Sequence, residues 1–283
     1  MPELPEVETI ARKLRPAIAG KRIAAVFLSG KALRRPVPAD FAARLLNRTV
    51  RTIHRRGKYL IVEMRPHAFW LIHLGMSGRL SYMPGAAKRP RHTHATICFA
   101  GGGELQYFDP RRFGLMDVYE LPRLEELPEV MQLGKDPLSS KIAAAWLWQE
   151  LAHTRRDIKS FLLDQRRIAG VGNIYACEVL FRARVHPERR CNKLNRSDAA
   201  ALARAIREVL QAAVDHRGTS FSDFRDSDGA PGEHQDFLQV FQREGEKCRR
   251  CLAVIHRLRQ GNRSTYYCPR CQEKGPGGTR KRK

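Results

Sequence analysis

The hydrophobic positions at the start of the chain predict a helix over residues 3–19. Apolar side chains recur there at helical spacing, at Val7, Ile10, Leu14 and Ile18. Pro5 suits the first turn of a helix, because the N–H groups there have no partner within the helix and proline lacks this group. Three glutamates lie near the positive end of the helix dipole, which also favours this interpretation.

From Lys21 to about Leu121 the pattern changes to short runs of β-branched and aromatic residues separated by turns. Seven strands are predicted, over residues 22–29, 49–55, 59–64, 70–74, 93–99, 105–108 and 115–120. Three consecutive glycines, 101–103, favour a hairpin turn between two of these strands. Many short strands with frequent turns are typical of a sandwich or a barrel. We therefore expect an N-terminal β-sandwich with a leading helix.

Beyond Leu121 the pattern becomes helical. Three prolines and several acidic residues between 121 and 138 indicate a linker. Ser197 is the predicted N-cap of the last helix, and Gly218 lies just past its end. Helices are predicted over residues 141–152, 157–165, 173–183 and 198–215.

Four of the seven cysteines form two CxxC pairs, Cys248 with Cys251 and Cys268 with Cys271. Four thiolates at this spacing suit tetrahedral Zn²⁺, and because they fill every coordination position, one structural zinc is expected rather than a catalytic one. Turns at 244–245 and 261–262 predict a small metal-stapled β-hairpin, rich in arginines that suit contacts with phosphates.

These patterns together predict an α+β multidomain protein with a β-sandwich, a helical domain and a β-hairpin zinc finger. The final segment lacks hydrophobic residues and is expected to be a disordered basic tail. The predicted boundaries are 1–121 for the sandwich, 122–138 for the linker, 139–236 for the helical domain, 237–272 for the zinc finger and 273–283 for the tail.

The charge of the chain narrows the class of partner. Its 283 residues include 52 Lys and Arg against 29 Asp and Glu, which gives a net charge of +23. Such an excess favours a polyanionic partner, nucleic acid before membrane. No apolar run approaches the ~18 residues that a membrane span needs. The first residues lack the basic and apolar regions of a secretory signal, so a cytoplasmic location is expected.

The N-terminus carries a possible nucleophile. If Met1 is removed, the chain begins with the secondary amine of Pro2, and an α-amino group has a pKa of ~8 against ~10.4 for lysine. A neutral secondary amine that attacks an aldehyde-level carbon gives an iminium ion. Glu3 beside it is a candidate general acid or base. From composition alone, the simpler interpretation is that these two residues merely begin a helix.

Other motifs are weak when taken singly. The turn Gly170-Val171-Gly172-Asn173 would expose backbone N–H groups to a phosphate, but it also fits a plain turn between helices. Lys58 has the appearance of a surface lysine beside a strand. Met76 and the pair Arg112-Phe113 lie in turns, where apolar or cationic side chains could enter a stack of bases.

Together, these motifs resemble the formamidopyrimidine-DNA glycosylase family, bacterial base-excision enzymes for oxidised purines. The resemblance covers nearly the whole chain, and seven motifs in the family's order make it specific. The motifs are Pro2–Glu8, Gly57–Leu60, His73–Gly78, Asp109–Gly114, Gly170–Ala176, Gly218–Ser220 and the cysteine hairpin with Asn262–Thr265.

The resemblance implies a fold, a partner and a mechanism. A monomer with a helix–two-turns–helix module would bind double-stranded DNA in a cleft between its domains and flip the oxidised nucleotide out of the stack. Pro2 would attack C1′ and displace the base, while Glu3 would protonate the sugar ring oxygen. Successive β- and δ-elimination would then cut the strand on both sides of the sugar.

The resemblance also implies roles for individual residues. Lys58, Asn173 and Arg263 would clamp phosphates around the lesion, with Lys58 and Arg263 counted in the catalytic set. Met76, Arg112 and Phe113 would fill the vacated space, with Arg112 facing the orphaned cytosine. Base recognition is expected from Glu6, Thr219 and Ser220, and further DNA contacts from His92, Arg111 and Lys159.

Two features depart from the family's pattern. Gln242 follows Phe241 where Tyr-Gly is expected, near the start of the cysteine hairpin. The tail after Gln272 is longer and more basic than the family needs, which indicates extra, salt-dependent affinity for DNA of any sequence.

Three alternatives remain open from sequence. The related endonuclease VIII, of the same fold, prefers oxidised pyrimidines, but it typically has glycine at the position of Leu4, and the Met76, Arg112 and Phe113 set also favours the purine enzyme. A non-catalytic zinc-ribbon protein that binds nucleic acid would explain the charge and the cysteines, yet it has no use for a processed Pro2. An RNA-associated protein fits the charge but not the β-rich first domain.

Overall fold

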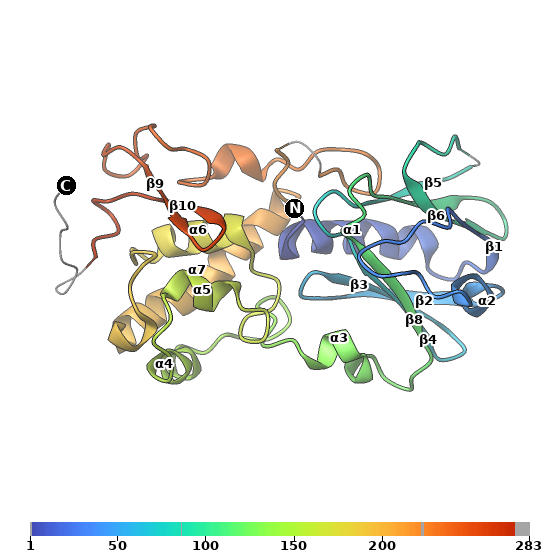
Figure 1. Ribbon diagram of the computed structural model, residues 1–283, viewed down its shortest axis with the longest axis horizontal. Helices are drawn as coiled ribbons and strands as arrows, with labels where there is room; N and C mark the ends of the chain where they lie inside the picture. Colours follow the sequence, from blue (N-terminus) through green and yellow to red (C-terminus); the bar gives the residue numbers. More distant parts are fainter. Residues whose placement is uncertain (1, 86, 222–223, 275–283) are drawn as a thin grey trace. The chain divides into compact units, whose positions relative to one another are not determined.

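The computed structural model describes residues 2–85, 87–221 and 224–274 (Figure 1). The chain divides into two compact units, one of residues 1–133 with 213–235 and the other of residues 134–212 with 236–283. The predicted domain boundaries stay predictions, and most of the predicted basic tail lies outside the described residues. Within the described part, no helix has the length and apolar character needed to cross a membrane.

The first unit contains two four-stranded antiparallel sheets, which confirms the predicted sandwich. In one sheet the strand order is β1-β6-β7-β5, and in the other it is β2-β3-β4-β8. The strands are β1 (Ile23–Leu28), β2 (Thr49–Arg56), β3 (Tyr59–Arg65), β4 (Ala68–His73), β5 (Arg79–Met83), β6 (Thr93–Phe99), β7 (Glu104–Phe108) and β8 (Leu115–Tyr119). The glycines 101–103 form the predicted hairpin turn between β6 and β7.

Helix α1 (Leu4–Ile18) shares one core with both sheets. Its apolar stripe, predicted from the spacing, is fully buried at Val7, Ile10, Leu14 and Ile18. The stripe packs with Leu60 and Trp70 from one sheet and Ile97 and Tyr107 from the other. Burial of this stripe anchors the helix, so the position of its N-terminus is set by the core.

The second sheet is buried on both faces, which explains why β4 reads as a continuous apolar run. Its other face packs against the short elements η1 (Leu124–Glu126) and α3 (Pro128–Met131). Leu127 and Val130 lie against Phe69 and Leu71 in this second cluster. The proline-rich segment therefore adds apolar cover to the sheet.

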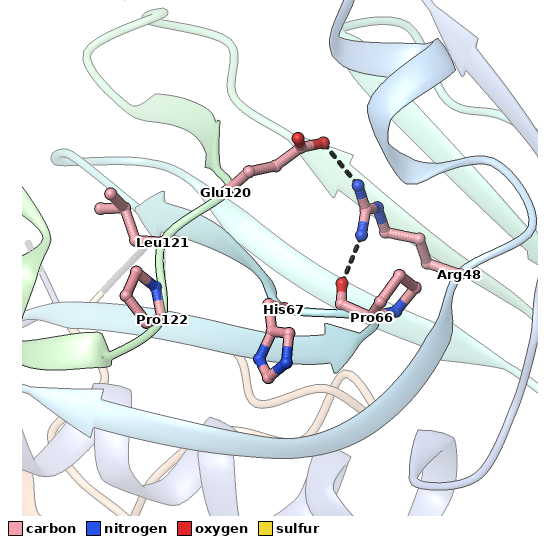
Figure 2. Close-up of a pocket in the computed structure, with 6 residues that line it drawn as sticks. All are labelled: Arg48, Pro66, His67, Glu120, Leu121 and Pro122. Atoms are coloured by element: carbon pink, nitrogen blue, oxygen red, sulfur yellow. Dashed lines mark hydrogen bonds and ion pairs between the residues drawn. The ribbon is translucent and has the colours of Figure 1, made fainter.

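Arg48, just before β2, links the segments that follow β3 and β8 of the same sheet (Figure 2). Its guanidinium bonds to Glu120, at 2.5 Å, and to the carbonyl oxygen of Pro66. His67, Leu121 and Pro122 complete a surface pocket of about 410 Å³. None of the predicted site residues lines this pocket, so the contact is a structural one.

The second unit is mainly helical and ends in a two-stranded hairpin. The four predicted helices are present, although the first begins at Ala144, three residues later than predicted. They are α4 (Ala144–Ala152), α5 (Ile158–Leu163), α6 (Asn173–Arg182) and α7 (Arg196–Asp215); the short helices η2 (Cys191–Lys193) and η3 (His234–Phe237) and the strands β9 (His256–Gln260) and β10 (Arg263–Tyr267) complete the described elements.

The predicted cap of α7 was wrong. The helix begins at Arg196, so Ser197 lies inside its first turn. Asn195 caps it instead, because its side-chain oxygen accepts a bond from the Asp198 N–H at 2.8 Å. The Asp198 carboxylate accepts one from the Asn195 N–H in return. This reciprocal pair satisfies two backbone donors. At the other end, Gly218 follows the helix as predicted.

Two elements of the sandwich were missed from sequence, in addition to η1 and α3 in the predicted linker. Strand β5 has only five residues and follows directly on a glycine turn, so its alternation is too short to stand out. Helix α2 (Phe41–Leu45) is one and a half turns long and buries only Phe41 and Leu45. Both elements depend on tertiary packing for their conformation.

Replacing Asn195 with alanine should lower the free energy of unfolding by about 1 kcal/mol, because the Asp198 N–H loses its side-chain acceptor. Urea unfolding at neutral pH measures this change. Ser197→Ala is the matched control and should change stability by less than half as much. Equal effects of the two substitutions would contradict the capping assignment.

Candidate active site and nucleic-acid interface

The carboxylate of Glu6 organises the N-terminus of α1. One of its oxygens accepts a hydrogen bond from the Glu3 N–H at 2.7 Å, and the other accepts one from the Thr219 N–H at 2.7 Å. Glu3 and Glu6 are each only 1 % exposed. Pro2, also buried, precedes Glu3. The structure therefore brings Pro2, Glu3, Glu6 and Thr219 together.

This arrangement requires a glycine before Thr219. Gly218 has φ +80°, and a Cβ there would lie 2.9 Å from a carboxylate oxygen of Glu6. A side chain at this position would therefore be strained and would also push against the buried carboxylate. Ser220 supports the same segment, because its hydroxyl donates to the Phe224 carbonyl and accepts from the Gly232 N–H.

Lys58 lies in the two-residue turn between β2 and β3, where Gly57 takes φ +55°. The lysine is only 9 % exposed. Arg55, just before the turn, forms an ion pair with Glu8 of α1 at 2.7 Å and donates to the Gly57 carbonyl. Burial alone would raise the pKa of Glu8, but its bonds to Arg55 and Arg12 lower it. This pair, missed from sequence, fixes the Lys58 turn against α1.

His73 at the end of β4 is held in its neutral form. Burial, followed by the positive charges of Arg34 and Lys58, lowers its pKa to about 3. Its Nδ1 accepts a hydrogen bond from the Gly75 N–H at 2.9 Å, which only an unprotonated Nδ1 can do. The ring therefore supports the start of the turn that carries Met76.

Met76 and Phe113 project from two neighbouring turns of the first unit. They are 37 % and 44 % exposed, so both apolar side chains face solvent in the free protein. Gly75 explains how the turns approach so closely, because a Cβ on it would lie 2.4 Å from the Phe113 carbonyl carbon. Gly75 and Phe113 are far apart in the sequence, so the contact between their turns could not be predicted from it.

The remaining predicted contacts of this unit are Arg111 and Arg112, next to Phe113, and His92. Arg112 is exposed and has φ +55°, and the Arg111 guanidinium lies 4.8 Å from the centre of the Phe113 ring. His92 is half-buried, also at positive φ, and its ring forms a T-shaped pair with the ring of Phe108. Cationic and aromatic groups thus alternate over this surface, as suits contact with stacked bases.

In the second unit, Asn173 and Lys159 meet the start of β10. The Asn173 amide donates to the Ser264 carbonyl at 3.0 Å, and the Lys159 ammonium donates to the same carbonyl at 3.2 Å. Arg263, next to Ser264, is exposed. Lys159 is only 1 % exposed and also bonds to Thr265, so its described contacts are with the hairpin. Its predicted DNA contact stays a prediction.

A polar chain that sequence analysis missed attaches the hairpin to α5. The Gln260 amide donates to Asp157, the N-cap of α5, at 2.9 Å, and accepts from the Thr265 hydroxyl at 2.9 Å. Buried polar groups that are fully paired hold one geometry. No local signal marks these residues, because each bond joins positions that are distant in the sequence or lie across a turn.

The hairpin presents arginines around a pocket of about 520 Å³. Arg257 is paired with Glu244 at 2.9 Å, whereas Arg259 and Arg263 carry no ion pair among the described residues. Guanidinium groups without an acidic partner suit contacts with phosphate oxygens. The pocket also includes Leu258, Asn262 and Ser264.

The four predicted cysteines lie together beside this hairpin. Their sulfur atoms all lie within 4.8 Å of one another, with Cys251 to Cys268 at 3.4 Å and Cys248 to Cys271 at 3.9 Å. Zinc–sulfur bonds of about 2.3 Å in a tetrahedron need sulfur separations of roughly 3.8 Å, so the site fits one structural Zn²⁺. Gln272, completely buried, then joins the Cys268 N–H to the Val185 carbonyl.

The departure at Gln242 has a structural consequence. Gln242 has φ +59°, in the left-handed region that glycine adopts without strain. Phe241 packs edge-on against Tyr266, and its N–H donates to the buried carboxylate of Glu178. Glutamine thus occupies a position whose backbone favours the expected glycine, while the neighbouring contacts hold the turn in place.

Removing the metal should unfold the hairpin, since the bonds from the cation to the four thiolates are what join the two CxxC pairs. Metal analysis of the purified chain should give one zinc per chain, and Cys271→Ser should remove most of it and lower the melting temperature. Cys98→Ser, outside the cluster, is the control and should keep the full zinc content. Zinc-free protein with an unchanged melting temperature would contradict this assignment.

The lowered pKa of His73 predicts a pH dependence of stability. The unfolded chain protonates this residue near pH 6.5, whereas the folded protein resists protonation down to about pH 3. The contribution of His73 is therefore complete above pH 6.5 and is lost progressively as the pH falls toward 3. His73→Gln should lose less stability than the wild type between pH 7 and pH 5 in urea unfolding. Identical losses in both proteins would contradict this, and the exposed His67→Gln serves as control.

Comparison with protein families gives three matches in chain order. The formamidopyrimidine-DNA glycosylase N-terminal domain matches residues 1–116, and the H2TH domain of the same enzymes matches residues 133–225. A zinc finger found in FPG and IleRS matches residues 245–274. The third match contains all four cysteines, which supports one structural zinc.

Full-length relatives agree with these matches. The formamidopyrimidine-DNA glycosylase of Methylococcus capsulatus is 44% identical, with 96% of this chain and 100% of the relative covered. The enzyme of the same name from Pelotomaculum thermopropionicum is 41% identical, over 96% of this chain and 99% of the relative.

Solved structures extend the similarity to the fold. The Fpg protein of Thermus thermophilus matches with a TM-score of 0.86 and 38% identity, over 97% of this chain and 100% of that one. A Lactococcus lactis Fpg bound to abasic-site DNA matches with a TM-score of 0.88 and 36% identity, over 96% of this chain and 100% of that one. Another complex of the Lactococcus lactis protein contains an oxidised pyrimidine. This chain therefore belongs to the formamidopyrimidine-DNA glycosylase family.

Proposed function

We propose that this protein is a bifunctional DNA glycosylase and lyase of base excision repair, which removes oxidised purines from double-stranded DNA. The observation that carries the proposal is the buried Glu3 beside Pro2 at the start of α1, held by the bonds of Glu6. A carboxylate fixed next to a potential amine nucleophile is the arrangement that Schiff-base chemistry needs. The family and its DNA-bound relatives support DNA as the substrate.

The chemistry begins at the N-terminus once Met1 is removed. The nitrogen of Pro2 attacks C1′ of the lesion nucleotide, a C–N bond forms, and the bond from C1′ to the base breaks. Glu3 protonates the sugar ring oxygen, the ring opens, and the nitrogen lone pair completes an iminium ion. The base leaves with the bonding electrons and takes up a proton.

The iminium ion then allows strand cleavage. It acts as an electron sink, so a proton is lost from C2′ and the 3′ phosphate leaves by β-elimination. A second elimination releases the 5′ phosphate and leaves a one-nucleotide gap. Addition of water to the remaining iminium ion releases the sugar fragment as an aldehyde and frees the Pro2 amine for another cycle. Glu3 is the group that we expect to carry protons between these steps.

DNA binding rests on residues of both units. Lys58 of the first unit and Asn173 and Arg263 of the second are proposed to hold phosphates near the lesion. The net charge of +23 favours this contact with a polyanion, and the affinity should fall steeply with salt. The zinc supplies no chemistry to the reaction, because four thiolates fill its coordination positions; it holds the hairpin that carries Arg263.

The exposed side chains of the first unit are proposed to enter the base stack. Met76 and Phe113 are apolar and protrude, and Arg112 lies beside Phe113, so the three suit the space left by a flipped nucleotide. Arg112 would face the orphaned cytosine. Glu6, Thr219 and Ser220 are proposed to recognise the flipped base, with further DNA contacts from His92, Arg111 and Lys159.

A cytoplasmic location next to chromosomal DNA and action as a monomer complete the proposal. Oxidised pyrimidines are a second substrate class to test, because a Lactococcus lactis relative was solved with such a lesion. Leu4, where the pyrimidine enzyme typically has glycine, favours purines as the main class.

Borohydride trapping tests this function. On duplex DNA with one 8-oxoguanine opposite cytosine, the wild type should give a covalent protein–DNA adduct, because borohydride reduces the iminium ion to a stable amine. Glu3→Gln should reduce the adduct at least about 100-fold, as expected for loss of general acid–base catalysis. Pro2→Gly should also trap more slowly. Gel electrophoresis quantifies the adduct.

Glu125→Gln is the control for Glu3→Gln, since it neutralises an exposed glutamate at a distant position and should trap as the wild type does. An adduct only on oxidised pyrimidines would move the protein to the related endonuclease VIII class. Tight DNA binding with no adduct on any lesion would leave a non-catalytic zinc-ribbon protein and end the enzymatic proposal.

A further inference from the structure

Asp109 is a fully buried carboxylate that lies between the Met76 turn and the Phe113 turn. One of its oxygens accepts a hydrogen bond from the Ser77 hydroxyl at 2.8 Å, and the other accepts one from the Gly114 N–H at 2.8 Å. Each carboxylate oxygen thus bonds to one of the two turns. A charge without solvent needs such donors, so the carboxylate binds both turns strongly.

A third donor lies beside the carboxylate. The hydroxyl of Tyr107 lies 3.4 Å from the oxygen that also accepts from Gly114. Burial, followed by the charge of Asp109, raises the pKa of Tyr107, so its hydroxyl keeps its proton and remains a donor. The Ser77 hydroxyl, the Gly114 N–H and the Tyr107 hydroxyl thus all face the carboxylate oxygens as donors.

The packing of the glycines matches these bonds. A Cβ on Gly75 would lie 2.4 Å from the carbonyl carbon of Phe113, and a Cβ on Gly114 would lie 1.7 Å from the Tyr107 hydroxyl oxygen. Both turns therefore touch through bare backbone. Arg34 adds to the same contact, because its guanidinium donates to the Phe113 carbonyl at 3.0 Å.

The backbone carbonyl of Asp109 takes part in a further set of hydrogen bonds, with His94 and Ser29. Its carbonyl accepts from His94 Nε2 at 3.0 Å, and the Nδ1 of that ring lies 2.9 Å from the Ser29 hydroxyl. Burial is the largest cause that lowers the pKa of His94, so the ring is neutral, donating at Nε2 and accepting at Nδ1. The residue is thus held from both its side chain and its main chain.

We propose that Asp109 is a positioning residue that couples the Met76 turn to the Arg112-Phe113 turn, so that the three side chains enter the DNA as one rigid unit. This inference rests on the proposed function for the insertion of these side chains. The coupling itself rests on the hydrogen bonds and the glycine contacts. Insertion of all three residues at once would require their relative positions to be set before DNA binds, which lowers the entropic cost of insertion.

Ser77→Ala is the sharpest test, because it removes only the bond from Asp109 to the Met76 turn and leaves the bond to Gly114. Single-turnover excision of 8-oxoguanine opposite cytosine should slow by about tenfold, as expected for loss of a hydrogen bond to a buried charge. The preference for cytosine over adenine opposite the lesion should also fall, because Arg112 would no longer be held in register. Ser77→Thr keeps the hydroxyl and should restore both.

The matched control is Ser81→Ala on β5, four residues further along the chain. Its side chain makes no hydrogen bond among the described residues, so the excision rate and the preference for cytosine should stay within twofold of the wild type.

The second comparison uses Met76→Ala. If Ser77 acts through Met76, adding Ser77→Ala to Met76→Ala should slow excision by less than twofold further.

Amide hydrogen exchange measures the coupling without relying on catalysis. In Ser77→Ala, exchange should accelerate in residues 111–114 as well as in residues 74–78, because the two turns share one carboxylate. Acceleration confined to 74–78, or multiplicative rate effects of Met76→Ala and Ser77→Ala, would overturn the proposal. If the wild type excises no lesion but exchange in Ser77→Ala still accelerates in both turns, the proposed function fails while the coupling of the turns stands.

Discussion

The buried carboxylate of Glu6 is the interaction on which the N-terminal site depends. It has to accept hydrogen bonds because it lies away from water, and the backbone N–H groups of Glu3 and Thr219 supply two of them. The first bond caps α1 and fixes the residue that follows Pro2. The second bond ties the segment after α7 to the same point and leaves no room for a side chain at Gly218. One carboxylate thus sets the surroundings of the proposed nucleophile.

The same principle recurs behind two of the residues that are proposed to contact DNA, Lys58 and Arg263. Arg55 bonds to Glu8 and to Gly57, which places the Lys58 turn against α1. In the second unit, the zinc cysteines and Gln260 hold the hairpin that carries Arg263. The exposed Arg263 is thus carried by a hairpin whose supporting side chains are paired and partly or fully buried. This division allows a highly charged protein to keep its contact residues in defined positions.

The parts of the fold and of the site that could be predicted from sequence are those marked by a periodic spacing of apolar residues or by a distinctive set of metal ligands. The spacing of Val7, Ile10 and Leu14 predicted α1, and two CxxC pairs predicted the zinc site. The cap of α7 was assigned wrongly to Ser197 because Asn195 and Ser197 are both good caps, and only the helix start at Arg196 distinguishes them. Asp109 and Gln260 were not assigned a supporting role, since their partners are set by the tertiary fold. The roles of the DNA-contacting residues came from family resemblance, because lone lysines, arginines and turns have no distinctive pattern.

The central claim is that the amine of Pro2 is the nucleophile. Peptide mapping of a borohydride-trapped adduct by tandem mass spectrometry tests it most directly. After trypsin and nuclease digestion, the account predicts a sugar remnant on the first nitrogen of the peptide Pro2–Arg12, with Met1 absent. An adduct on Lys58 or another lysine, or an N-terminal peptide that still begins with Met1 in the trapped protein, would contradict it.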